Sequence, residues 1–142
     1  MRLGALLQPG DLVCLRGELG AGKTTLVQGL AQGWGSLTPA TSPTFVLVNE
    51  YRRPGDVCLY HLDAYRIESC LEAEQLDLNT MLDEGVLVVE WPEIIEAVLP
   101  GERLWTELEI VEEGRRDLCF SAMGRRPGAL LASFRQAVYG VV

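Results

Sequence analysis

The sequence predicts an α/β domain with a mixed central sheet flanked by helices. Three observations support this prediction. A short apolar run at 11–16 leads through a glycine-rich segment into an apolar-periodic stretch at 23–32, as in a strand, a loop and a helix. The run VLVVE at 86–90 has the composition of a central strand buried on both faces. Two hairpin patterns accompany these elements, so strands and helices do not alternate strictly.

After the first strand and helix, residues 33–43 are rich in Gly, Ser, Thr and Pro, which predicts a loop. Residues 45–52 and 57–62 have the composition of strands. The segment 53–56 between them has Pro and Gly at its centre, so we expect a hairpin. Residues 67–82 are acidic with regularly spaced leucines, which predicts one or two short helices.

A second hairpin is expected from strands at 104–111 and 117–123. Pro127 is expected to start a last helix. One face of that helix would carry Leu130, Leu131, Phe134, Ala137 and Val138. The 142 residues are enough for one domain with its own core, so we expect a single domain over 1–142.

Composition limits the possible partners. Twenty acidic and twelve basic residues give a net charge near −8, which argues against direct binding of RNA or DNA. No apolar run reaches the length of a membrane span and no signal segment opens the chain, so a cytoplasmic protein is expected. Three cysteines, Cys14, Cys58 and Cys119, fall in apolar strand-like runs, where buried structural thiols are expected.

The strongest motif is a complete GxxxxGK(S/T) phosphate-binding loop, which reads Gly17-Glu18-Leu19-Gly20-Ala21-Gly22-Lys23-Thr24. Its small residues allow backbone N–H groups to curl around a phosphate. Lys23 supplies a positive charge to the β- and γ-phosphates, and the hydroxyl of Thr24 can bind Mg²⁺. The helix that follows points its N-terminus at the phosphates. The loop therefore predicts a nucleoside triphosphate site in a P-loop NTPase-like domain.

Hydrolysis or phosphoryl transfer also requires a metal-positioning carboxylate and a group that orients the attacking atom. Two residues compete for the first role. Glu90 ends the apolar run at 86–90, and Asp63 follows the strand-like run at 57–62. A surface carboxylate is the alternative for Glu90, and a helix cap or turn residue is the alternative for Asp63.

Two further features have both a functional and a structural interpretation. The hydroxyl-rich segment 41–44 either responds to the γ-phosphate or forms an ordinary turn. Trp91 either lines a nucleotide or partner pocket or packs against the core. The chain has no Asn-Lys-x-Asp string, so guanine recognition of the GTPase kind is unsupported.

Four segments together resemble the TsaE family, also called YjeE. They are GELGAGKTT at 17–25, TSPTFVLVNEY at 41–51, YHLDAYRI at 60–67 and VVEWPE at 88–93. The resemblance covers residues 11–111. It implies an ATPase that works with TsaB and TsaD subunits to make threonylcarbamoyladenosine next to the anticodon of tRNA. The partners would hold the tRNA, and TsaD would perform the transfer.

The resemblance also implies residue roles. Those that contact ATP would be Leu19, Gly20, Ala21, Gly22, Lys23, Thr24, Thr25 and Trp91. Thr24 and Glu90 would hold Mg²⁺, and Lys23, Thr25, Asp63 and Glu90 would be needed for catalysis. Family members usually have a further strand and helix before the first strand. Only ten residues precede Asp11 here, so those two elements are expected to be missing.

Two other functions remain open at this level. One is a small-molecule or protein kinase that uses the same loop, although no obvious lid with clustered arginines is present. The other is a nucleotide-gated binding module in which ATP orders the segment 41–44 to dock a partner. Slow hydrolysis is expected in isolation because no arginine finger is evident in the chain.

Overall fold

The computed structural model describes residues 2–18, 21–37 and 48–140. Its strands are β1 (Leu12–Gly17), β2 (Val48–Arg53), β3 (Val57–Asp63), β4 (Gly85–Glu90), β5 (Arg103–Glu112) and β6 (Arg115–Met123). Its α-helices are α1 (Arg2–Leu6), α2 (Lys23–Trp34), α3 (Cys70–Glu74), α4 (Leu78–Glu84) and α5 (Arg125–Tyr139). Three short 3-10 helices are η1 (Ala64–Arg66), η2 (Pro92–Ile94) and η3 (Glu96–Val98).

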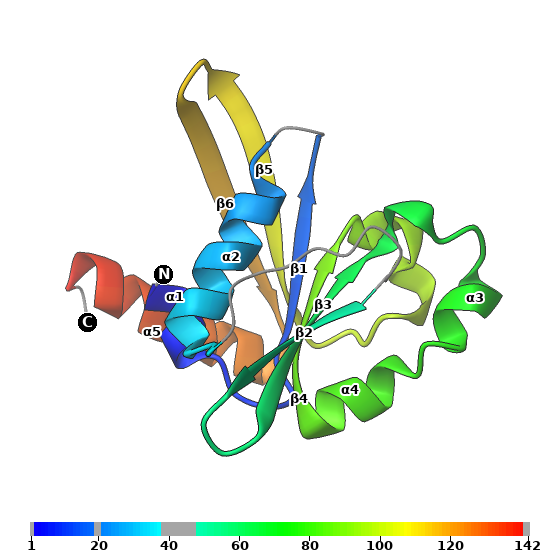
Figure 1. Ribbon diagram of the computed structural model, residues 1–142. Helices are drawn as coiled ribbons and strands as arrows, with labels where there is room; N and C mark the ends of the chain where they lie inside the picture. Colours follow the sequence, from blue (N-terminus) through cyan, green and yellow to red (C-terminus); the bar gives the residue numbers. More distant parts are fainter. Residues whose placement is uncertain (1, 19–20, 38–47, 141–142) are drawn as a thin grey trace.

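The strands form one six-stranded sheet in the order β2-β3-β4-β1-β5-β6 (Figure 1). The four inner strands run parallel, and the edge strands β2 and β6 are antiparallel to their neighbours. This confirms the predicted mixed α/β sheet and both predicted hairpins. Because β1, β3 and β4 are parallel, their carboxyl ends meet at one edge of the sheet.

Helices cover both faces of the sheet (Figure 1). Val13 and Leu15 of β1 face the core formed with α1, α2 and α5. Leu12 and Cys14 point the other way, into the core formed with α3, α4 and the 3-10 helices. Every residue of β4 is buried, as the apolar run at 86–90 predicts for a central strand covered on both sides.

The helix after β1 is two residues longer than the predicted range 23–32. It ends at Trp34, and the next residue, Gly35, has a left-handed backbone (φ 100°) that lets its N–H donate to the carbonyl oxygens of Ala31 and Gln32. The segment 67–82 forms two short helices, as expected. Asp77 separates them in a left-handed conformation (φ 55°). Residues 38–43 of the predicted loop and 45–47 of the predicted strand lie outside the described residues.

Other expectations were wrong or incomplete. The sequence reasoning missed α1, which packs on α2 with Gly4 so close to its backbone that a Cβ would collide there. Cys119 is exposed, because the residues of β6 that pack against the core are Phe120 and Ala122, which point to the other face of the strand. The last helix starts at Arg125, and Val138 near its end is 40% exposed because the helix extends past the sheet there. No helix within the described ranges is long and apolar enough to span a bilayer.

An ion pair with a buried carboxylate connects α5 to the start of β1. The Arg126 guanidinium donates through Nε and Nη2 to the two carboxylate oxygens of Asp11, at 2.9 Å each. Nη2 also donates to the carbonyl oxygen of Leu6 at 3.1 Å. The side chain of Asp11 is only 3% exposed, and its hydrogen bonds raise the pKa of Arg126. This contact fixes the C-terminal helix against the N-terminal elements.

Replacement of Arg126 by Met should therefore destabilise the fold. It would leave the buried Asp11 carboxylate without its main partner, at an expected cost of about 2 kcal/mol. Urea unfolding followed by circular dichroism measures the loss. Arg125→Met, at an exposed neighbouring position, is the control and should change stability by less than about 0.5 kcal/mol. Equal stability of both variants would contradict a stabilising role for the ion pair between Arg126 and Asp11.

The cysteines should differ in reactivity. Burial raises the pKa of the Cys14 thiol to about 12, so almost no thiolate forms at pH 8. Cys119 is exposed on an edge strand. Brief maleimide treatment of the native protein, followed by peptide mass spectrometry, should label Cys119 and leave Cys14 unmodified until urea is added. Comparable labelling of both thiols without denaturant would contradict the described core.

Candidate functional site

The candidate site begins where β1 passes into α2. Gly17 ends β1 in close contact with β5, and a Cβ there would lie 2.8 Å from the carbonyl oxygen of Leu108. Gly22 precedes α2 in a left-handed conformation (φ 98°), which favours glycine. Two of the predicted phosphate-binding residues, Leu19 and Gly20, lie outside the described residues. The described part of the loop thus has glycine where the backbone requires it.

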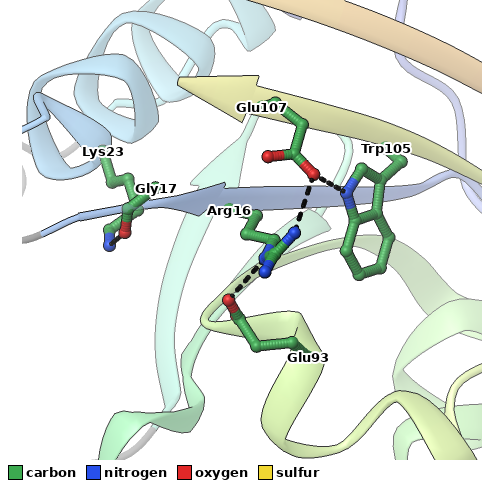
Figure 2. Close-up of polar contacts among 6 residues, drawn as sticks. All are labelled: Arg16, Gly17, Lys23, Glu93, Trp105 and Glu107. Atoms are coloured by element: carbon green, nitrogen blue, oxygen red, sulfur yellow. Dashed lines mark hydrogen bonds and ion pairs between the residues drawn. The ribbon is translucent and has the colours of Figure 1, made fainter. Parts of the chain in front are cut away.

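Lys23 is the first residue of α2 and is 6% exposed. Its ammonium donates to the carbonyl oxygen of Gly17 (Figure 2) and lies 3.6 Å from the ring centroid of Trp91. Burial lowers the pKa of Lys23, and the negative charges of Glu90, Glu93 and Asp63 partly offset this effect. The structure therefore brings this cation near the carboxylates at the ends of β3 and β4.

Thr24 and Thr25 follow in the first turn of α2, and both are exposed. Their hydroxyl groups are thus accessible to a ligand at the helix N-terminus. The predicted contacts of Thr24 with Mg²⁺ and of both threonines with ATP stay predictions.

The two competing carboxylates lie side by side in the sheet. Asp63 at the end of β3 pairs with Glu90 at the end of β4. Glu90 is only 4% exposed, whereas Asp63 is exposed and its Oδ1 accepts a hydrogen bond from the backbone N–H of Tyr65 at 3.0 Å. Asp63 therefore caps the 3-10 helix η1, as its structural interpretation predicts. This cap also fixes its carboxylate at the site's edge.

Trp91 follows Glu90 in a left-handed conformation (φ 58°), which is uncommon for a bulky residue. Its ring lies 5.0 Å from that of Tyr65 and also contacts the Lys23 ammonium. Its backbone N–H donates to the carbonyl oxygen of Leu15. Trp91 thus packs between the phosphate loop and the turn after β3, which makes it part of the candidate site.

Sequence reasoning missed Arg16, the residue of β1 next to Gly17, whose contacts are drawn in Figure 2. Its guanidinium donates to Glu93 at 2.9 Å and to Glu107 at 3.2 Å, and these bonds raise its pKa. Glu107 also accepts from the indole N–H of Trp105 at 3.0 Å. Arg16 thereby connects the turn after β4 to β5 beneath the phosphate loop.

An open cavity of about 460 Å³ borders Arg16 and the first residues of the phosphate loop. Its lining includes the acidic residues Glu18, Glu93, Glu107 and Glu109. A negatively charged lining disfavours a polyphosphate. The phosphates of a nucleotide are therefore expected at Lys23 and not in this cavity.

Sequence reasoning also missed His61, which lies on β3 two residues before Asp63 and so on the same face of the sheet. Its Nε2 is 2.7 Å from Oε2 of Glu90. The segment 60–67 has a histidine two residues before an acidic strand end, and this pattern is the signal that could have identified it. The segment 41–44, also predicted to respond to the nucleotide, lies outside the described residues.

The ionisation of Lys23 can be tested directly, because it is the only lysine in the chain. In protein labelled with [¹³Cε]lysine, one signal should titrate with a pKa below the ordinary value, since burial disfavours the charged form. Glu90→Gln should lower the pKa further by removing a favourable negative charge. Asp83→Asn, at an exposed position near the other end of β4, is the control and should have no effect. A Lys23 pKa above the ordinary value would contradict this environment.

Comparison with known proteins gives a consistent result. The family model for "Threonylcarbamoyl adenosine biosynthesis protein TsaE" matches residues 1–118. The TsaE protein of Bacillus subtilis (strain 168) is 42% identical over 123 residues, which cover 86% of this chain and 76% of the relative. The TsaE protein of Streptomyces coelicolor is 53% identical over 105 residues, covering 72% of this chain and 71% of the relative.

The fold agrees with these sequence matches. The crystal structure of YdiB from Bacillus subtilis superposes with a TM-score of 0.76 and 34% sequence identity, covering 96% of this chain and 85% of that one. The family match, the sequence relatives and the shared fold agree with the resemblance inferred from the four motifs. The chain therefore belongs to the TsaE family.

Proposed function

We propose that residues 1–142 act as one ATPase domain that supports threonylcarbamoyladenosine modification of tRNA. The observation that carries the proposal is the convergence of three chain segments at one edge of the sheet. Lys23 lies there beside the phosphate loop, within electrostatic reach of Glu90 and Asp63. This is the combination of cation and carboxylates that phosphoryl chemistry requires. The relatives' names, tRNA threonylcarbamoyladenosine biosynthesis protein TsaE, supply the biological context.

The donor set fits Mg²⁺. Glu90 offers a carboxylate and Thr24 a hydroxyl, the hard oxygen donors that this ion prefers. Among the described residues, no cluster of three or more His, Cys, Asp or Glu side chains forms a complete metal cage. One carboxylate and one hydroxyl are a donor set that suits Mg²⁺, which usually takes one or two carboxylates and completes its coordination with phosphate and water. When bound, the ion would neutralise charge that develops on the phosphate oxygens.

The chain's own residues would divide the remaining tasks. The backbone of residues 19–24 would cradle the phosphates of ATP, with Lys23 stabilising their charge. Thr25 would contact the nucleotide from the first turn of α2. The water that attacks the γ-phosphate would be oriented by Asp63, by Glu90 or by a group from a partner subunit. Trp91, whose ring lies against the Lys23 ammonium, would also contact the nucleotide.

The charge of the chain supports an indirect role toward tRNA. A net charge near −8 disfavours binding to a polyanion, so partner subunits of the TsaB and TsaD kind would hold the tRNA. ATP hydrolysis by this chain would support turnover of the complex that those subunits form. This assignment implies a cytoplasmic location, where tRNA is modified.

Phosphate release from Mg·ATP, measured with and without a TsaB–TsaD pair, tests the proposal. We expect slow release alone and stimulation by the pair. Lys23→Ala and Glu90→Ala should each lower stimulated release about 100-fold or more, because each removes charge stabilisation or metal positioning. Asp83→Ala, an exposed carboxylate near the far end of β4, should behave as wild type.

Other outcomes would select other functions. Transfer of the phosphate to an acceptor would identify a kinase. A Glu90→Ala protein that binds ATP and still supports tRNA modification would identify a nucleotide-gated binding module. If the partners neither bind nor stimulate the protein, the proposed role in the complex is wrong.

A further inference from the structure

His61 is the only histidine in the chain, and its side chain is buried beside that of Glu90. The two side chains are 9% and 6% exposed. The distance from Nε2 of His61 to Oε2 of Glu90, 2.7 Å, is that of a strong hydrogen bond. The imidazole and the carboxylate therefore form one buried polar unit at the carboxyl ends of β3 and β4.

The direction of this hydrogen bond follows from its chemistry. An ionised carboxylate only accepts hydrogen bonds, so Nε2 must donate when Glu90 is ionised. The other ring nitrogen, Nδ1, has no partner among the described residues. Within that part of the chain, the polar contact of His61 is directed at Glu90 alone.

The backbone explains why His61 can reach Glu90. Glu90 pairs directly with Asp63, and His61 lies two residues earlier on β3, opposite Val88. Side chains two residues apart on a strand share one face, so His61 is a diagonal neighbour of Glu90. That face is the one covered by α2, which also carries Lys23.

Lys23 is a competing partner for Glu90. A lysine and a carboxylate attract each other when both are charged; burial lowers the pKa of Lys23, and the negative charge of Glu90 partly offsets this effect. Within the described residues, however, no ion pair joins them, and the Lys23 ammonium contacts Gly17 and Trp91. The polar partner that the structure gives the Glu90 carboxylate is His61.

We propose that His61 is a positioning residue for the metal-binding carboxylate. Its Nε2–H fixes the orientation of Glu90, so that the carboxylate is available to Mg²⁺ and does not collapse onto Lys23. The inference rests on the proposed ATPase function, because it assigns Glu90 to the metal. Hydrogen bonds to ligating carboxylates commonly change metal affinity by about 10- to 100-fold when removed.

Equilibrium binding separates this role from a purely structural one. The probe is a fluorescent ATP analogue, titrated in EDTA and in Mg²⁺ buffer. His61→Leu removes the donor and should reduce the Mg²⁺-dependent gain in affinity about 10-fold or more, while binding in EDTA stays within about twofold. His61→Gln keeps an N–H donor near the position of Nε2 and should retain most of the gain. An unchanged gain in folded His61→Leu protein would overturn the proposal.

A double-mutant cycle adds a specific control. In a Glu90→Gln background the metal ligand is already lost, so His61→Leu should cause no further loss of the Mg²⁺-dependent gain. An additive loss would mean that His61 acts through another group, and the proposal would be wrong. Failure of the wild type to bind the analogue in either buffer would instead reject the proposed nucleotide site.

A spectroscopic test needs no substitution and applies even where His61→Leu does not fold. Because the chain has one histidine, ¹⁵N-histidine labelling gives the ring signals of His61 alone. A long-range ¹H–¹⁵N spectrum at neutral pH should identify Nε2 as a protonated nitrogen, and its signal should move in Glu90→Gln. An unprotonated Nε2 would rule out donation to Glu90 and overturn the proposal.

Discussion

The backbone register of three parallel strands determines where the chemistry of this protein can occur. Leu15 of β1 and Asp63 of β3 both pair with Glu90 at the end of β4. This pairing fixes the ends of three strands at one level, and the phosphate loop starts two residues after Leu15. Because side chains alternate along a strand, a slip of one residue would turn Glu90 away from α2 and Lys23.

Side-chain contacts then join segments that are far apart in the sequence. Two side-chain pairs join the end of β4 and the turn after it to β3 and the 3-10 helix η1. They are Glu90 with His61, and Trp91 with Tyr65. Arg16 holds the same turn from the other side of the sheet through Glu93. Displacement of any one of these contacts would be felt by the others, because the carboxylate and the strained Trp91 are consecutive residues. The end of β4 with its turn and the end of β3 with η1 therefore form one structural unit.

The sequence predicted the parts of the fold that depend on local pattern. The unbroken apolar run of β4, the turn at 53–56 and the glycines of the phosphate loop each have one dominant physical interpretation. It also placed Glu90 and Asp63 at strand ends. It could not order the strands, because β1 lies between β4 and β5 through long-range pairing that no local pattern encodes.

The same limitation explains the errors. The residues around Cys119 have the composition of a buried strand. The strand that they form, β6, lies at the edge of the sheet, and the thiol is exposed there. His61 and Arg16 are single polar residues in strands, and nothing local indicates that they contact Glu90 and Glu93. Their partners are 29 and 77 residues away along the chain. Only the assembled sheet brings each pair together.

The contact of Lys23 with Gly17 and Trp91 has a consequence for ligand binding. A phosphate that engaged this ammonium would compete with a carbonyl oxygen and an aromatic face that already contact it. Binding is thus an exchange of partners, and its net free energy is smaller than the attraction between the lysine and the phosphate alone. The same exchange in reverse assists departure, because the protein supplies the lysine with new partners as the phosphate leaves. The contacts that Lys23 makes without a ligand therefore favour the release of a phosphate and weaken its binding.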